Sequence, residues 1–152
     1  MKAKELKSAL LQKCQEALEK RYQTVKLHIK DIEESLMEES KNTAGDKHET
    51  GRAMLQIERE NAGKQLQEIE RERDFLKRID INTNSDYARL GSLAHTDKAT
   101  YFISSSIGSV TVGNTTYYCV AYSSPIGQLL SGKKKGDSFS FQDKSFTISS
   151  IR

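Results

Sequence analysis

The stretch Gly45-Asp46-Lys47-His48-Glu49 (residues 45–49) divides two amphipathic runs of sequence that mirror each other. Apolar residues before it recur with alternating gaps of four and three, which is the seam spacing of a coiled coil. Apolar residues after it have a matching spacing when the sequence is read in the opposite direction. The first run contains Leu18, Tyr22, Val25, Ile29, Ile32 and Leu36, and the second contains Leu55, Ala62, Leu66, Ile69 and Leu76.

One antiparallel register satisfies both runs, because the position numbers of facing residues always add to 91. A constant sum is what a hairpin folded at residues 45 and 46 requires. We therefore predict an antiparallel two-helix coiled coil over residues 1–80, with an acidic tip at residues 45–49. The facing pairs are Leu36 with Leu55, Ile29 with Ala62, Val25 with Leu66 and Tyr22 with Ile69.

Two seam positions in this register are arginines. Arg59 falls opposite Ile32 and Arg73 opposite Leu18, so we expect arginine stems to fill the seam while their charged ends turn to water. Gly63, inside the second helix, costs roughly 1 kcal/mol relative to alanine. The hairpin is therefore expected to be only moderately stable by itself.

The composition changes at residues 80–86, a polar and turn-rich stretch that we take as the domain boundary. Residues 81–152 then show six short runs of strand character and one short helix with Ile126, Leu129 and Leu130 on one face, which ends at Gly132. We predict an α+β fold in which the coiled coil precedes a small antiparallel sheet carrying that helix. The predicted strands are Leu90 to Thr96, Thr100 to Ile103, Ser109 to Val112, Tyr117 to Tyr122, Ser138 to Phe141 and Phe146 to Ile151.

Charge and hydropathy restrict the class of protein. No apolar stretch approaches the ~20 residues of a membrane span, and the N-terminus leads directly into helical sequence, so we expect a cytoplasmic protein without a membrane anchor. Residues 1–80 carry 17 basic and 17 acidic side chains, so the net charge of +3 belongs to the C-terminal part. That excess is too small to predict autonomous DNA binding. Cys14 and Cys119 have no neighbouring cysteines and are expected to be free thiols.

Two motifs resemble the bacterial Gre transcript-cleavage factors over nearly the whole chain. The tip matches the family's G-D-x-x-E pattern at residues 45–49. The C-terminal half matches its S-P-I-[AG]-x-x-L-x-G-K segment and a following G-D. The matching residues there are Ser124, Pro125, Ile126, Gly127, Leu130, Gly132, Lys133, Gly136 and Asp137.

The resemblance implies an FKBP-like C-terminal domain that binds RNA polymerase at the rim of its secondary channel, while the coiled coil reaches toward the active centre. Asp46 and Glu49 would help to hold a second Mg²⁺ ion shared with the polymerase, which itself cleaves the 3′ end of backtracked RNA. The factor would contact the nascent RNA end only indirectly, would bind no cofactor alone, and would not be an enzyme. The polymerase-binding residues carried over are Ser123, Ser124, Pro125, Ile126, Gly127 and Lys133.

Other interpretations remain open. Asp46 and Glu49 also have the spacing of an N-terminal capping box, and His48 is interpreted as a solvated loop residue. Ser123 replaces a frequent Asn or Asp, and the family's N-A-E-Y run after the tip is replaced by residues 50–53, Thr-Gly-Arg-Ala. Because of these departures, two alternative functions remain open. One is a secondary-channel regulator that does not stimulate cleavage, and the other is a coiled-coil adaptor. We expect a monomer, because each helix covers the other's seam.

Overall fold

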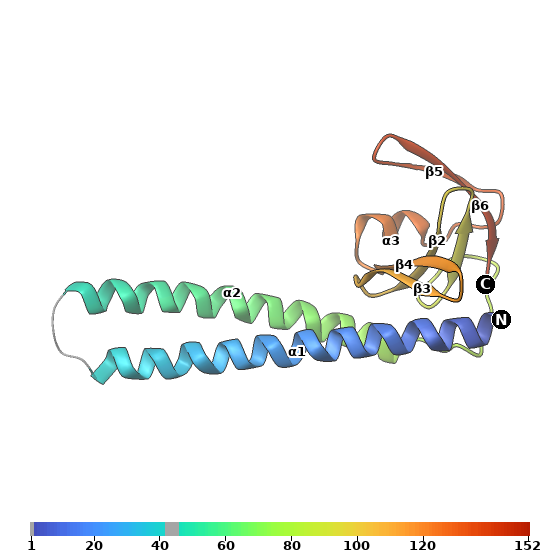
Figure 1. The fold of residues 1–152 in the computed structure, drawn as a ribbon. Coiled ribbons are helices and arrows are strands. Elements are labelled where there is room, and N and C mark those ends of the chain that lie inside the picture. The colour runs from blue at the N-terminus through green and yellow to red at the C-terminus, as the bar shows by residue number, and fades with distance from the viewer. Residues whose placement is uncertain (1, 42–45) are drawn as a thin grey trace. The chain divides into compact units, whose positions relative to one another are not determined.

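The computed structural model describes residues 2–41 and 46–152, with only the backbone described for residues 46–48. Within these ranges it has the predicted α+β class, with two long helices followed by six strands and a short helix (Figure 1). The helices are α1 (Ala3–Lys41), α2 (Asp46–Lys77) and α3 (Pro125–Leu130). The strands are β1 (Leu93–Thr96), β2 (Thr100–Ser104), β3 (Gly108–Val112), β4 (Thr115–Ala121), β5 (Ser138–Phe141) and β6 (Lys144–Ile151).

The chain forms two compact units that both include parts of the long helices. One unit consists of Met1–Leu18 and Glu72–Arg152, and the other of Glu19–Arg71. The predicted boundary between residues 80 and 81 lies in the loop just after α2. The sheet unit also includes residues on the N-terminal side of that boundary. Leu6, Leu10 and Cys14 of α1 are buried in one core with Leu93 and Phe102 of the sheet.

The helical unit, Glu19–Arg71, has the antiparallel seam that the sequence predicts. Val25, Leu36, Leu55 and Leu66 pack around its buried centre, which is formed by Ile29, Ile32 and Ala62. Arg59 Nε donates to Glu33 Oε1 at 3.2 Å, and a Cβ atom placed on Gly51 would lie 3.5 Å from Glu39 Oε1. These pairs have position sums of 92 and 90, on either side of the predicted 91. The Arg59 side chain also remains 41% exposed, as expected for a charged end turned to water.

The sheet has the strand order β3-β4-β2-β1-β6-β5. The prediction of a wholly antiparallel sheet is wrong at one pair, because β2 and β4 are parallel, with Phe102 opposite Cys119. The cause is topological. β3 lies two strand positions away from β2, and the tight turn at Gly113 (φ 63°) returns β4 into the position between them. β4 therefore runs antiparallel to β3 and parallel to β2.

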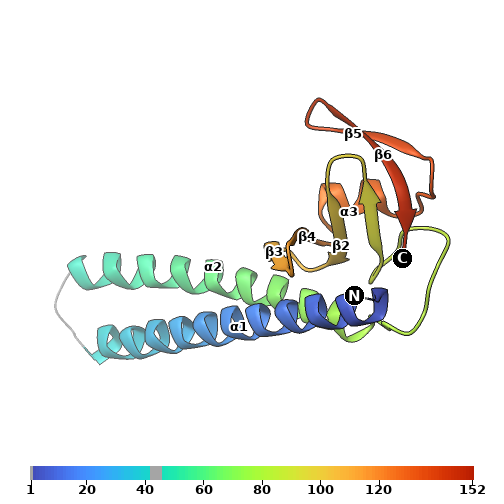
Figure 2. The same cartoon turned by 45° about the vertical axis from the view of Figure 1, so that its right-hand side comes forward.

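Each face of the sheet buries a separate core. The first core joins the start of α1 and the end of α2 to the sheet, and its fully buried members include Leu10, Leu18 and Phe102. The second core joins α3 to β5 and β6, and includes Ile103, Leu130 and Ile148. Figure 2 shows α3 on the side of the strands away from the N-terminal part of α1. The sheet is thus covered on both faces.

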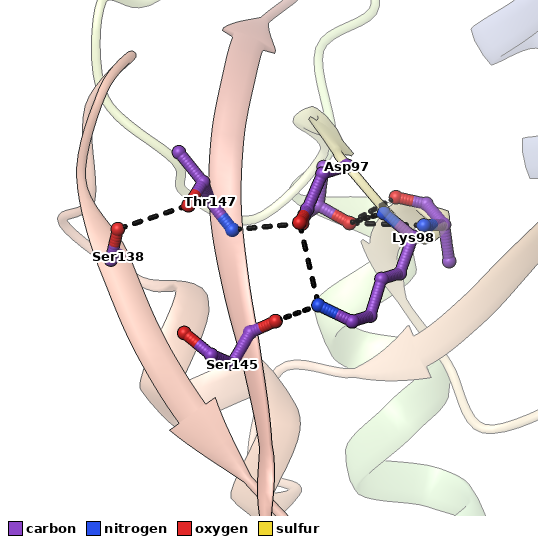
Figure 3. A network of polar contacts seen from close by, with 7 residues as sticks. Asp97, Lys98, Ser138, Ser145 and Thr147 are labelled. Atoms are coloured by element: carbon purple, nitrogen blue, oxygen red, sulfur yellow. Dashed lines mark hydrogen bonds and ion pairs between the residues drawn. The ribbon is translucent and has the colours of Figure 1, made fainter.

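A polar network attaches the β1–β2 turn to the β5–β6 hairpin (Figure 3). Asp97 Oδ1 accepts a hydrogen bond from the backbone N–H of Thr147 at 2.9 Å, and Asp97 Oδ2 lies 3.3 Å from Lys98 Nζ. The Lys98 ammonium group also donates to the carbonyl oxygen of Ser145 and lies 5.1 Å from the centre of the Phe146 ring. The hydrogen bond from Thr147 is the main reason that the pKa of Asp97 is below its ordinary value.

Gly63 offers a test of the helical seam. A Cβ atom at this position would meet only Arg59 Nη1, at 3.2 Å, which is the far end of a flexible side chain. We expect Gly63→Ala to raise the free energy of unfolding by about 0.5–1 kcal/mol, because alanine loses less backbone entropy in a helix. Urea unfolding monitored by circular dichroism measures the change. A lower stability would show that Arg59 cannot move aside.

Asp97 offers a test of the polar network. Its lowered pKa stabilises the folded state fully above the ordinary pKa of 3.8, and this contribution disappears as pH falls through the lower folded value. Asp97→Asn should therefore lower the thermal midpoint at pH 7 and remove this component of acid destabilisation below about pH 4. Asp143→Asn, on the exposed β5–β6 turn, is the matched control. Equal pH profiles for wild type and Asp97→Asn would contradict the assignment.

Candidate functional site

The predicted acidic tip is only partly described by the structure. α2 begins at Asp46, so the backbone of residues 46–49, which the sequence predicts as a loop between the helices, is helical. Gly45 and the side chains of Asp46, Lys47 and His48 lie outside the described residues, so the capping-box alternative stays a prediction. Glu49 is described: it lies in the first turn of α2 and is exposed to solvent. Its carboxylate is therefore accessible to a partner or a metal ion.

Arg52 lies one helical turn beyond Glu49 and binds the end of α1. Its Nη1 atom donates to the carbonyl oxygen of Leu36 at 3.4 Å and also to the Ser40 hydroxyl. Leu36 precedes the last four residues of α1, and its carbonyl oxygen also accepts from the Ser40 hydroxyl at 2.9 Å. Arg52 therefore joins the start of α2 to a turn of α1 that is already hydrogen-bonded. The residue that departs from the Gre pattern at this position thus has a structural role, and it places a positive charge near the tip.

The predicted docking segment forms the start of α3. Ser124 is the N-cap: its hydroxyl oxygen accepts from the N–H of Gly127 at 3.1 Å and donates to the carbonyl oxygen of Ala121 at 2.7 Å. Pro125 occupies the first helical turn, where a missing N–H costs nothing. The Gln128 side chain donates to the carbonyl oxygen of Tyr122 at 2.8 Å. Local hydrogen bonds therefore hold the loop of residues 122–125 in one conformation.

The six predicted docking residues differ in their accessibility. Ser123 and Pro125 are exposed, whereas Ile126 is 8% exposed and belongs to the core beneath α3. Gly127 is also buried, and Lys133 is half-buried, with its carbonyl oxygen accepting from the N–H of Ala88 at 2.7 Å. Only the loop around Ser123 and Pro125 is thus free to contact a partner directly. Ile126 and Gly127, which are buried, fix the position of that loop.

An open cleft of about 510 Å³ begins at Tyr122, directly beside this loop. The centres of the Phe75 and Tyr122 rings are 5.5 Å apart. The Arg78 guanidinium group lies 5.5 Å from the centre of the Phe75 ring. Arg89 Nη2 donates to the Thr83 hydroxyl at 3.0 Å. The complete lining is Phe75, Arg78, Asp80, Thr83, Arg89, Leu90 and Tyr122. These residues come from α2, from the loop between α2 and β1, and from the turn after β4, so no local sequence motif predicts the cleft.

Lys7 does not line the cleft, but it is buried where the charge of the lining residue Arg89 acts on it. It is only 2% exposed and forms no ion pair with any residue that the structure describes. Burial lowers the pKa of Lys7, and repulsion from the Arg89 guanidinium group lowers it further. Two aromatic rings and several cations suit a partner surface that combines acidic and apolar side chains.

The described residues contain no group of three or more His, Cys, Asp or Glu side chains that could hold a metal ion. One exposed carboxylate such as Glu49 does not bind Mg²⁺ tightly, because this ion needs several oxygen ligands. The predicted shared Mg²⁺ site therefore requires further ligands from a partner. The two predicted parts of the functional site, at the tip and on α3, belong to different compact units. In residues 2–41 and 46–152, no helix has the length and apolar character needed to cross a membrane.

A substitution at Gly127 tests the close packing of the loop that precedes α3. A Cβ atom there would collide with the carbonyl oxygen of Ala121 and lie 2.8 Å from that of Tyr122, both of which are backbone atoms. We expect Gly127→Ala to reduce the free energy of unfolding by about 2–3 kcal/mol, as overpacked cores do. Urea unfolding measures the loss, and Ser123→Ala in the exposed part of the loop should change stability by less than about 0.5 kcal/mol. Equal stability of the two variants would contradict this account of Gly127.

No protein-family model matches the chain, and no curated protein matches it. Among solved structures, the chain is similar to one described as the structure of the transcription factor Gfh1, with a TM-score of 0.35 and 17% sequence identity. The match covers 90% of this chain and 91% of that chain. A structural similarity this low does not identify the family.

Proposed function

We propose that this protein is a Gre-like transcription elongation factor. It would enter the secondary channel of RNA polymerase and stimulate the polymerase's own cleavage of backtracked RNA. The proposal depends on the match of both motifs to the Gre pattern in the right order. The observation that supports it most is the antiparallel helical seam, together with the solvent-exposed Glu49 in the first turn of α2.

Carboxylates at this end suit the chemistry of a two-metal cleavage. One Mg²⁺ ion activates the attacking water while the other stabilises the leaving oxygen, and the more weakly held ion limits the rate. Glu49, together with Asp46, would supply oxygen ligands for that ion in addition to those of the polymerase. The factor would then raise the cleavage rate without providing a general acid or base.

The sheet unit supports the docking part of the proposal. Its exposed loop at Ser123 and Pro125 is held rigid by the Ser124 cap, so binding would require little ordering of this loop. The neighbouring cleft presents Arg78 and Arg89 beside two aromatic rings. An acidic surface with apolar side chains on the polymerase would complement this combination.

Arg52 favours a second candidate function, a secondary-channel regulator that docks without stimulating cleavage. The Gre pattern has glutamate at this position, whereas here a guanidinium group bound to the end of α1 lies one turn from Glu49. A positive charge there weakens the attraction between the tip carboxylates and Mg²⁺. Both candidate functions require binding to RNA polymerase, and they differ only in the cleavage step.

The decisive experiment measures RNA cleavage in arrested elongation complexes of a bacterial RNA polymerase, with and without the full-length protein. We expect Asp46→Asn and Glu49→Gln each to reduce the stimulated rate at least roughly tenfold, a loss of about 1.4 kcal/mol of transition-state stabilisation. Both variants should still bind the polymerase, because neither residue belongs to the docking loop. Glu58→Gln, an exposed carboxylate further along α2, is the matched control and should cleave like the wild type.

Three outcomes separate the functions. A binding protein that gives no stimulation in any variant would identify the non-cleaving regulator. Stimulation that is equal in wild type, Asp46→Asn and Glu49→Gln would exclude a role for the tip carboxylates. Absence of any complex with purified RNA polymerase would contradict both candidate functions and leave the coiled-coil adaptor.

A further inference from the structure

Two cysteines that lie far apart in the sequence meet inside the sheet unit. Cys14 belongs to α1 and Cys119 to β4, and they are 0% and 1% exposed. Both belong to the core that joins the start of α1 to the sheet, and both are free thiols. Cys14 Sγ lies 3.4 Å from the hydroxyl oxygen of Ser104 on β2. Cys119 lies on the adjacent strand β4, paired with Phe102, so it is on the same face of the sheet as Ser104. Both thiols are therefore in the same part of the core, closed to solvent.

The surroundings of the sulfur atoms are unusually polar for an apolar core. Cys14 Sγ lies 3.4 Å from the hydroxyl oxygen of Ser104, which is fully buried and donates to the carbonyl oxygen of Phe102 at 3.2 Å. Ser105 is also fully buried, and its hydroxyl oxygen has no hydrogen-bond partner among the residues that the structure describes. Apolar side chains would fill such a site at lower cost, because each buried polar group must give up its water.

This polar environment shifts the pKa values of the two thiols in opposite directions. The hydrogen bond from Cys119 is the largest cause that lowers the pKa of Cys14, with further lowering by Ser104 and Ser105, while burial acts in the opposite direction. The same hydrogen bond and burial raise the pKa of Cys119. Cys14 is thus the thiol that loses its proton first, and the thiolate is the reactive form of cysteine.

We propose that Cys14 and Cys119 form an oxidative modification site, in which a peroxide converts the two thiols into an intramolecular disulfide that bonds α1 covalently to β4. The proposal is independent of the proposed function. Both cysteines come from elements that already pack in one core, so the bond would link segments that are neighbours in the native fold. Because the site is closed, oxidation would occur during local opening of the α1 segment from the sheet.

The reaction balances as two thiols and one hydrogen peroxide giving one disulfide and two waters. The Cys14 thiolate attacks one peroxide oxygen, which breaks the O–O bond, forms the sulfenic acid and releases hydroxide that takes up a proton as water. The Cys119 sulfur then attacks the Cys14 sulfur, forming the S–S bond. The Cys119 proton leaves with the departing hydroxide as the second water. Peroxide is reduced by two electrons, which the two sulfur atoms lose.

The cross-link should stabilise the fold strongly, because it closes a long loop in the unfolded chain. A closed loop of about 100 residues loses much of its conformational entropy. For a chain of this size we expect the thermal midpoint of the full-length protein to rise by on the order of 10 °C after oxidation. Reduction with dithiothreitol should reverse the shift.

The test treats the reduced, full-length protein with hydrogen peroxide and maps its peptides by mass spectrometry without reduction. The expected product is a monomer in which the peptides of Cys14 and Cys119 are linked, with the loss of two hydrogen atoms. Cys14→Ser and Cys119→Ser are the controls and should show no peroxide-dependent rise of the thermal midpoint. The peptide map of the wild type tests the proposal even if a serine variant folds poorly.

Three results would overturn the proposal. The first is a map showing intact thiols after peroxide treatment that oxidises exposed methionines. The second is sulfinic or sulfonic acid at Cys14 without a linked peptide, and the third is a disulfide between two molecules. A linked peptide accompanied by a lower thermal midpoint would likewise reject the claim that the bond fits the native fold.

Discussion

The fold depends first on the burial of one apolar stripe that runs almost the whole length of α1. Leu10 and Leu18 are fully buried in a core shared with the sheet, and Ile29 and Ile32 are buried against α2. The free energy of this burial holds the helix in place, since helices of high charge content gain little from propensity alone. Each of the two compact units thus includes residues of this stripe in its core.

The spacing within the stripe explains why one helix serves two cores. Leu6, Leu10, Cys14 and Leu18 follow each other at intervals of four residues, so each side chain is rotated by about 40° from the one before. A stripe that turns this way faces more than one neighbour. Beyond Leu18 the intervals alternate between four and three, which keeps the side chains on the narrow seam of a coiled coil.

The Ser-Pro-Ile-Gly segment illustrates how a segment that resembles a docking motif can also be a folding motif. Ser124 caps α3, Ile126 fills the core, and Gly127 permits a close approach to backbone carbonyl groups. These three roles leave Ser123 and Pro125 as the accessible part of the segment. The resemblance to a docking motif and the local physical chemistry are therefore compatible, because a rigid loop is what a binding surface needs.

The sequence by itself determined the antiparallel helical register, the places of the six strands and the short helix with its stop at Gly132. These features follow from periodicity and turn chemistry, which act between near neighbours or repeat along one helix. Tertiary structure alone decided the parallel pairing of β2 with β4, the packing of the first residues of α1 into the sheet unit, the cleft lined by Arg78 and Arg89, and the contact of Cys14 with Cys119. Each of these joins segments that are distant in sequence, and nothing in either segment records its partner. Their meeting is set by how a whole sheet and two helices share the burial of apolar surface.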